Sequence, residues 1–197
     1  MGEPLEILIS VLVVLLLLGG LIYWLWRSTP RHRDPLEPLD ATGWLVIVDG
    51  SNVSFRENRA RLEYLEEVLE LLEHRFQGAR FLVQCDASLR HRFRGKERRR
   101  FEELLAKDKR FAQAPKGRKA DDFILHEAAE HGQAIVVSHD RFSKGPELEM
   151  RLNVPLLRIS FHEDPPVLAQ KILIFEDEDD PERPRVIDLA EFLESER

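Results

Sequence analysis

A run of 20 apolar residues constrains this chain more than any other feature. It extends from Ile7 to Trp26 and contains no Asp, Glu, Lys or Arg. At a rise of about 1.5 Å per residue, a helix of this length spans roughly the 30 Å hydrocarbon core of a bilayer. Tyr23, Trp24 and Trp26 stand at its end, where interfacial aromatic side chains are expected. The sequence therefore predicts one transmembrane helix over residues 7–26.

The flanking charges predict the orientation of this helix. Residues 1–6 contain two Glu and no basic residue, whereas residues 27–33 contain three Arg. The positive-inside rule then places the C-terminal side in the cytoplasm and residues 1–6 outside it. A cleaved signal peptide is the main alternative, but it would begin with a basic segment. We expect a single-pass membrane protein whose lipid partner is the bilayer around residues 7–26.

The remaining sequence divides into a linker, one domain and an extension. Residues 27–42 contain three Pro, which favour an extended linker. Residues 43–163 alternate apolar runs with amphipathic segments, which predicts an α/β domain with a parallel sheet. Its expected strands are residues 45–48, 80–85, 111–114, 134–138 and 156–161, and its expected helices are residues 56–76, 88–107 and 121–131. Residues 164–197 form an acidic extension with a predicted strand and a terminal helix.

Carboxylates stand where the predicted strands end. Asp49 follows the first strand, Asp86 the second and Asp140 the fourth, and the helix before that fourth strand opens with Asp121 and Asp122. Ligands bind beyond the carboxyl ends of parallel strands, so these five residues should meet at one edge of the sheet. Each alone could be a turn or capping residue. Two carboxylates about 5 Å apart, however, repel by roughly 3 kcal/mol. Mg²⁺ or Mn²⁺ would relieve that repulsion and support phosphoryl chemistry.

A basic segment leads directly into the Asp121–Asp122 pair. Residues 90–119 contain 13 Lys and Arg against four acidic residues, although the whole chain has a net charge of -7. This arrangement suits a nuclease, in which basic side chains position phosphates beside an acidic metal pocket. A solvated helix face or a contact with anionic lipid are the alternatives. The predicted phosphate contacts are Arg98, Arg99, Arg100, Arg118 and Lys119.

Several other kinds of site are excluded or unsupported by the sequence. The single cysteine, Cys85, excludes an intramolecular disulfide and a multi-Cys zinc site. Because Cys85 lies within a predicted apolar strand, we expect it to be an inert core residue. No P-loop and no dinucleotide-binding glycine motif occurs, so nucleotide hydrolysis and NAD binding have no support.

Three motifs, in this order, are similar to those of a known family. They are VIVDGSNV at 46–53, KADDFIL at 119–125 and IVVSHD at 135–140, with CDASLR at 85–90 between the first two. Over roughly residues 44–161 the chain resembles the NYN branch of PIN-like ribonucleases and, within it, the ribonuclease domain of the CCCH-finger Regnases. The resemblance implies a three-layer α/β sandwich with a parallel sheet, an acidic Mg²⁺ pocket and cleavage of single-stranded RNA.

The resemblance also implies roles for individual residues. The implied metal ligands and water-orienting residues are Asp49, Asp121, Asp122 and Asp140, and Asn52 would fix a carboxylate by hydrogen bonding. The chain departs from the family in two respects. It contains no CCCH finger, and Lys144 stands where the Regnase pattern has a further acid. Asp86 or Glu147 could substitute for that acid.

The predicted function is therefore a membrane-anchored, cytoplasmic endoribonuclease. It would use Mg²⁺ or Mn²⁺ to activate the water that cleaves single-stranded RNA. Lys144 and the anchor keep an alternative open, namely a catalytically inactive adaptor that binds RNA or anionic lipid on the same fold. The sequence is also compatible with a homo-oligomer. It predicts no disulfide partner.

Overall fold

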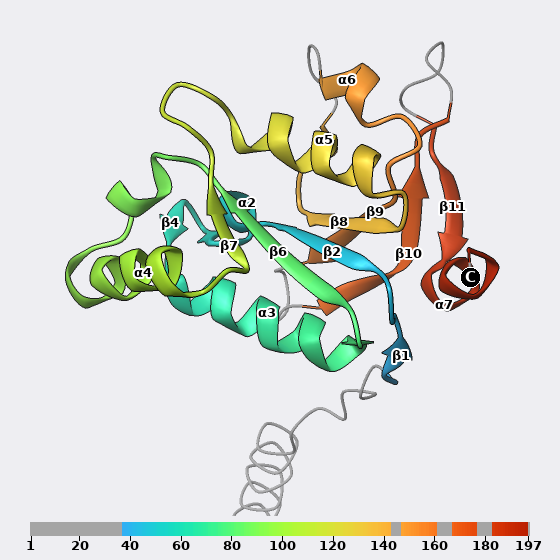
Figure 1. Ribbon diagram of the computed structural model, residues 1–197, viewed down its shortest axis with the longest axis horizontal. Coiled ribbons are helices and arrows are strands. Elements are labelled where there is room, and N and C mark those ends of the chain that lie inside the picture. Colours follow the sequence, from blue (N-terminus) through green and yellow to red (C-terminus); the bar gives the residue numbers. More distant parts are fainter. Residues whose placement is uncertain (1–36, 143–146, 161–166, 177–182, 197) are drawn as a thin grey trace, which may run out of the picture. The chain divides into compact units, whose positions relative to one another are not determined.

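A seven-stranded, mostly parallel sheet organises the computed structural model, which describes residues 37–142, 147–160, 167–176 and 183–196 (Figure 1). The strands are β2 (Leu45–Asp49), β6 (Arg80–Cys85), β7 (Phe111–Gln113), β8 (Ala134–Ser138), β9 (Leu156–Ser160), β10 (Val167–Ile174) and β11 (Arg185–Asp188). Their order is β11-β10-β9-β8-β2-β6-β7. Strands β9, β8, β2, β6 and β7 run parallel, and the β9–β10 and β10–β11 pairs are antiparallel.

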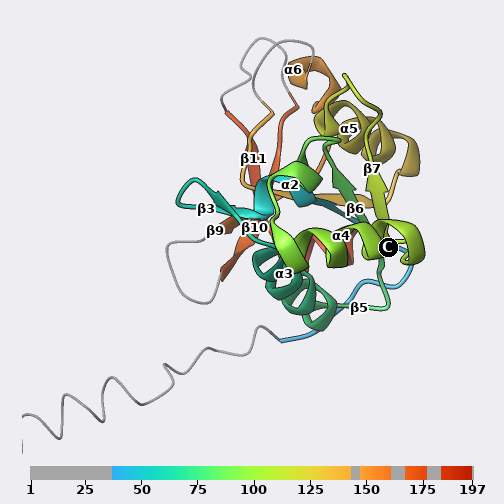
Figure 2. The same cartoon turned by 90° about the vertical axis from the view of Figure 1, so that its left-hand side faces the viewer.

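Helices cover both faces of this sheet, which gives three layers (Figures 1 and 2). Helices α3 (Leu62–Arg75) and α4 (Gly95–Lys107) lie on one side, and α5 (Ala120–His131) lies on the other. The shorter elements are α2 (Gly50–Val53), the 3₁₀ helix η1 (Leu89–His91), α6 (Glu147–Met150), α7 (Leu189–Ser195), the parallel pair β1 (Leu39–Asp40) and β5 (Phe76–Gln77), and the hairpin of β3 (Phe55–Arg56) and β4 (Arg59–Ala60). The predicted α/β architecture is confirmed.

The central strand β2 is buried on both faces, which explains its continuous apolar sequence. Leu45 and Ile47 belong to the same core cluster as Ile124 of α5. Val46 and Val48 are also fully buried, and side chains alternate along a strand, so these two face the opposite layer. Burial on both sides makes β2 a rigid support for the residues that follow it.

The turn from β2 into α2 requires glycine at position 50. A Cβ atom there would lie 2.5 Å from the Sγ atom of Cys85 and 2.9 Å from Cγ1 of Val83, both on β6. This close approach fixes the turn against the neighbouring strand, and Asp49 with it. Cys85 is a buried free cysteine, as predicted.

Two predicted helices are shorter than their sequence patterns suggested. The helix expected from residue 56 begins at Leu62, because residues 55–60 form the β3–β4 hairpin. Glu57 and Asn58 form its turn with φ angles of 48° and 62°, as a type I′ turn requires. The helix expected over residues 88–107 is divided into η1 and α4, and α4 begins at Gly95, whose φ is 54°.

The C-terminal extension adds to the same sheet. The strand expected over residues 171–175 overlaps β10, and β11 pairs with β10 at the sheet edge. The predicted transmembrane segment over residues 7–26 lies outside the described residues, as does Lys144. Within the described ranges, no helix combines the length and the hydrophobicity of a membrane span.

Candidate functional site

The strand order reverses at β2, which is where open α/β sheets form a ligand crevice. From β2 the chain passes through α3 to β6 and through α4 to β7, and it then returns through α5 to β8 on the other side of β2. Strand β2 ends at Asp49 and β8 ends at Ser138. A pocket of about 360 Å³ lies at this edge of the sheet.

Four of the five predicted strand-edge carboxylates line this pocket. They are Asp49, Asp86, Asp121 and Asp140. They come from the end of β2, the end of β6, the start of α5 and the segment after β8. The fold therefore brings together aspartates that are up to 91 residues apart in the sequence. We call this the acidic pocket.

Asp49 is the most buried of these groups, with 3% of its surface exposed. Its two carboxylate oxygens accept hydrogen bonds from the Asn52 backbone N–H at 3.0 Å and from the Ser138 hydroxyl at 2.8 Å. Burial raises the pKa of Asp49 to about 7, and these two hydrogen bonds oppose the rise. The negative charges of Asp121 and Asp86 add to it. The site thus holds a carboxylate whose negative charge is poorly compensated.

Asp121 experiences the same electrostatic environment. Partial burial raises its pKa to about 6, and the charges of Glu147, Asp86 and Asp140 contribute to the increase. Lys119 acts in the opposite direction. The acids around this pocket therefore repel one another, which is the condition under which a cation is attracted.

Hydrogen bonds join the ends of β2 and β8 beneath the acidic pocket. The Ser138 hydroxyl donates to Asp49 and accepts from the Asp140 backbone N–H at 3.0 Å. The Asn52 side-chain oxygen accepts from the His139 backbone N–H at 2.9 Å. Asn52, which was expected to fix a carboxylate, thus does so through its backbone, while its side chain holds the segment after β8.

Asp86 connects β6 to the first turn of α5. Its backbone N–H donates to the Ser51 hydroxyl at 2.7 Å, and its carboxylate accepts from the Ala120 backbone N–H at 2.9 Å. Asp86 is therefore a capping residue for α5, as the alternative reading of a strand-end Asp allowed. This contact places Asp121, the next residue of α5, beside Asp86.

Two other predicted ligands lie outside the lining of the acidic pocket. Asp122 faces Arg118 at 3.7 Å, which is too long for a hydrogen bond. Glu147 is almost fully buried and pairs with Lys119 at 2.6 Å. Lys119 and Arg118, both predicted phosphate contacts, are thus turned toward acids of their own chain.

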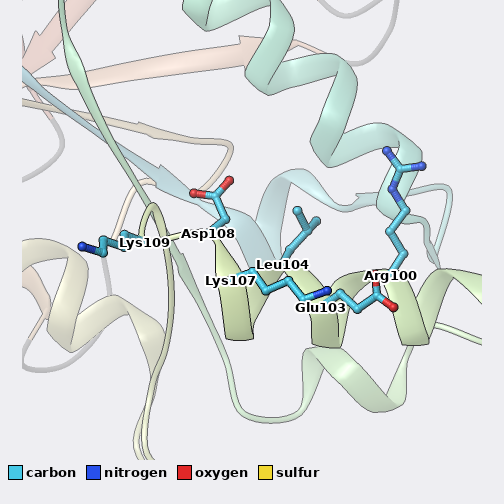
Figure 3. A pocket seen from close by; sticks show the side chains of 6 residues that line it. All are labelled: Arg100, Glu103, Leu104, Lys107, Asp108 and Lys109. Carbon is cyan, nitrogen blue, oxygen red and sulfur yellow. The ribbon is translucent and has the colours of Figure 1, made fainter.

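The predicted phosphate contacts on α4 do not line the acidic pocket either. Arg98 pairs with Glu102 at 2.9 Å, and Arg100 pairs with Glu66 at 2.8 Å. Arg99 is exposed on the same helix. A separate pocket of about 440 Å³ at the C-terminal half of α4 includes Arg100, but it mixes acidic and basic side chains and contains none of the strand-end aspartates (Figure 3).

Several residues of the acidic pocket and its support were missed from sequence. Ser51 and Ser138 stand inside the motifs VIVDGSNV and IVVSHD, so their position beside strand-end aspartates was a usable signal. Phe55 and Arg92 also line the pocket. They come from the β3–β4 hairpin and the end of η1, and neither element shows a periodic pattern that would place it here.

The residues of the acidic pocket suit a hard divalent ion in their chemistry. All the acidic donors are carboxylate oxygens, and Asp49 forms no ion pair with any described residue. Across the described ranges, no three His, Cys, Asp or Glu side chains are grouped closely enough to hold a metal by themselves. Mg²⁺ usually binds one or two carboxylates and takes its other ligands from water and substrate phosphates, so the arrangement fits such an ion.

Comparison with known proteins identifies the family. A family model described as a Zc3h12a-like ribonuclease NYN domain matches residues 44–171. The chain belongs to this family. The resemblance of the motifs to NYN ribonucleases is therefore confirmed, and the NYN domain has a PIN-like α/β fold with a mostly parallel central sheet.

Solved structures include chains that are similar to this one. Arabidopsis thaliana nuclear protein-only RNase P 2 matches with 16% identity and a TM-score of 0.51, over 86% of this chain and 37% of that chain. The NYN chain thus spans little more than a third of that protein. The PIN domain endonuclease Utp24 matches with 20% identity and a TM-score of 0.38, over 67% of this chain and 96% of that chain. No curated protein sequence matches the chain.

Proposed function

We propose that this protein is a metal-dependent endoribonuclease that hydrolyses phosphodiesters of single-stranded RNA. One observation carries the proposal: Asp49 is buried without a cationic partner among the described residues, and it shares a pocket with Asp86, Asp121 and Asp140. Uncompensated carboxylates at a topological switch point indicate a site that functions with a bound cation. The membership of a ribonuclease family supplies the reaction class.

The proposed cofactor is Mg²⁺ or Mn²⁺. One or two of Asp49, Asp121 and Asp140 would hold it directly and the others through water, with Asp86 as a weaker ligand. Asp122 stays a proposed ligand, because it lies next to Asp121 in the first turn of α5 and its contact with Arg118 is longer than a hydrogen bond. When bound, the ion would supply a water nucleophile at neutral pH and neutralise charge on the phosphate.

Hydrogen bonds from neighbouring residues position these acids. Ser138 donates to one oxygen of Asp49 and so orients the carboxylate toward the pocket. Asn52 holds the segment that carries Asp140 through the His139 backbone N–H. These contacts act as an outer shell that keeps the acids in place before substrate binds.

Cleavage of labelled RNA tests this proposal directly. The full chain should cut single-stranded RNA internally in Mn²⁺ or Mg²⁺ and should be inactive in EDTA, because the acids alone cannot generate the nucleophile. A base-paired RNA of the same sequence should be cut more slowly. Equal cleavage in EDTA and in Mn²⁺ would contradict metal dependence.

Thermal unfolding separates this proposal from the inactive adaptor. If the acids bind a metal, Mn²⁺ at a hundred times its dissociation constant should stabilise the protein by about 2.7 kcal/mol. The stabilisation should disappear in Asp49→Asn. Metal-dependent stabilisation without RNA cleavage would favour the adaptor, and an unfolding temperature indifferent to Mn²⁺ in both proteins would argue against a metal site.

We further propose that residues 7–26 anchor the protein to a membrane with the NYN domain in the cytoplasm. The support is the uninterrupted apolar run and the three Arg residues that follow it. The full chain should sediment with membranes and resist extraction at alkaline pH, and a chain lacking residues 7–26 should not. A protease added to sealed cells should leave the NYN domain intact. Release of the full chain by alkaline extraction would contradict the anchor.

A further inference from the structure

We infer that a second pocket beside the acidic pocket binds a phosphate of single-stranded RNA next to the bond that is cut. This inference rests on the proposed function, since it concerns the path of the same substrate. The second pocket has a volume of about 430 Å³. The side chains that matter here are Phe55, Arg59, His91, Arg92, Arg94 and Glu97. We call it the basic pocket.

The basic pocket adjoins the acidic pocket. Phe55 and Arg92 line both of them. A chain of nucleotides that leaves the acidic pocket past these two side chains therefore enters the basic one. Figure 2 shows the hairpin that carries Phe55 beside α2, which begins directly after Asp49.

The arginines of the basic pocket are available to a ligand. Arg59, Arg92 and Arg94 are exposed, and none forms an ion pair with an acid in the described ranges. The one acid of the pocket, Glu97, accepts a hydrogen bond from the Leu62 backbone N–H at 3.3 Å. Its charge thus faces the N-terminus of α3, where a negative charge is favoured. The pocket keeps an excess of positive charge.

This availability distinguishes the basic pocket from three of the five positive residues predicted from sequence. Arg98, Arg100 and Lys119 each pair with an acid of the chain. A phosphate would have to compete with those acids, whereas it would meet no such competitor at Arg59 or Arg94. The arginines that would contact the RNA are therefore Arg59 of the hairpin and Arg92 and Arg94 before α4.

The hairpin that forms one wall is held in place by its own contacts. Arg56 pairs with Glu67 of α3 at 2.6 Å, and its guanidinium lies 4.0 Å from the centroid of the Tyr64 ring. Phe55 pairs with Ala60 and Arg56 with Arg59 in the register of the hairpin. Arg59 consequently lies on a paired strand whose neighbour, Arg56, contacts α3.

The opposite wall is anchored by an aromatic pair. Phe93, which lies between Arg92 and Arg94, is buried, and its ring centroid is 4.9 Å from that of Phe101. Burial of Phe93 leaves its two neighbours at the surface. Packing of Phe93 fixes the backbone that carries Arg92 and Arg94, so binding a phosphate orders fewer backbone torsions than it would in a free loop.

The side chains of the two pockets favour single-stranded RNA over duplex RNA. Planar guanidinium groups bind phosphate oxygens in a bidentate manner, and an aromatic side chain such as Phe55 stacks on an unpaired base. In a duplex the bases are already stacked on one another and cannot reach that ring. The basic pocket therefore orients the strand so that an adjacent phosphodiester lies in the acidic pocket.

Binding measurements test this subsite independently of catalysis. The full chain carrying Asp49→Asn would be titrated with a fluorescent single-stranded RNA of about 12 nucleotides. In that background, Arg59→Ala and Arg94→Ala should each weaken binding about tenfold, and each should reduce the salt dependence by the contribution of about one phosphate. Arg59→Lys should retain part of the affinity, because it keeps the charge but loses the planar fork.

Lys107→Ala is the matched control. It also removes one positive charge from the basic segment, but Lys107 lies at the opposite end of α4 in the pocket of mixed charge (Figure 3). It should change the affinity less than about twofold. Equal weakening by all three alanine variants would overturn the subsite, because the effect would then be general electrostatic attraction.

Two further outcomes keep the subsite separate from the proposed function. If the Arg59 and Arg94 variants bind RNA weakly but the wild-type chain never cleaves it, the subsite stands and the nuclease activity fails. If the wild type cleaves RNA and both variants bind like Lys107→Ala, the activity stands and the subsite fails. Binding of anionic vesicles that depends on Arg59 and Arg94, with RNA binding unaffected, would assign the pocket to lipid and overturn the inference.

Discussion

Replacing Asp49 by Asn is expected to lower the rate of RNA cleavage about a thousandfold, because it removes the most buried charge of the acidic pocket. The amide oxygen can still accept from Ser138 or from the Asn52 backbone N–H, so the fold should be kept. Initial rates on a labelled single-stranded RNA at saturating Mn²⁺ measure the effect. A loss smaller than about tenfold would show that Asp49 does not take part in the reaction.

Asp188→Asn is a matched control for this substitution. Asp188 is an exposed residue that caps α7 by accepting from the Ala190 backbone N–H at 2.9 Å. Asn caps a helix about as well as Asp, so stability and activity should be unchanged. Ser138→Ala should fall between the two, with a loss of about 10- to 100-fold, because Ser138 orients Asp49 without itself being a ligand.

The second large expected effect is a loss of stability with rising pH in metal-free protein. The pKa of Asp49 is about 7 in the folded protein and near 3.8 when unfolded. Between these values the folded state keeps a proton that the unfolded state has released. The free energy of unfolding should therefore fall as pH rises from about 4 to about 7, by an amount on the order of 4 kcal/mol. Asp121 adds a smaller effect of the same sign below about pH 6.

Chemical denaturation at pH 5 and pH 8 in EDTA measures this effect. Subtracting the values for Asp49→Asn from those of the wild type removes the contributions of other titrating groups. The wild type should lose stability relative to the variant between the two pH values, and Mn²⁺ at pH 8 should restore it by binding the ionised acids. A difference between wild type and variant that does not change with pH would contradict this account of the site.

The sequence predicted that aspartates far apart in the chain would lie close together, and this prediction depended on a general property of parallel sheets. Carboxyl ends of parallel strands share one edge, so Asp49, Asp86 and Asp140 could be placed together once their strands were recognised. The strands themselves were recognisable because burial on both faces demands continuous apolar runs, as at residues 45–48. Residues whose position follows from strand ends were therefore predictable.

The side-chain partners were not predictable in this way. A sequence shows that Arg98, Arg100 and Lys119 are basic, but it does not show that Glu102, Glu66 and Glu147 lie against them. Such ion pairs join different elements or different turns, and they depend on the packing of helices. The same reason hid Arg92, which lines the acidic pocket next to Phe93, whose ring packs against Phe101.

The sequence by itself determined the alternation of strands and helices, the family and the set of acids at the sheet edge, because these follow from local hydrophobic patterns and short motifs. Only the tertiary structure decided that Asp86 caps α5, that Ser138 supports Asp49, and that Arg59, Arg92 and Arg94 line one pocket. Those relations are contacts between elements far apart in the chain. They are set by how the layers pack and not by any local pattern.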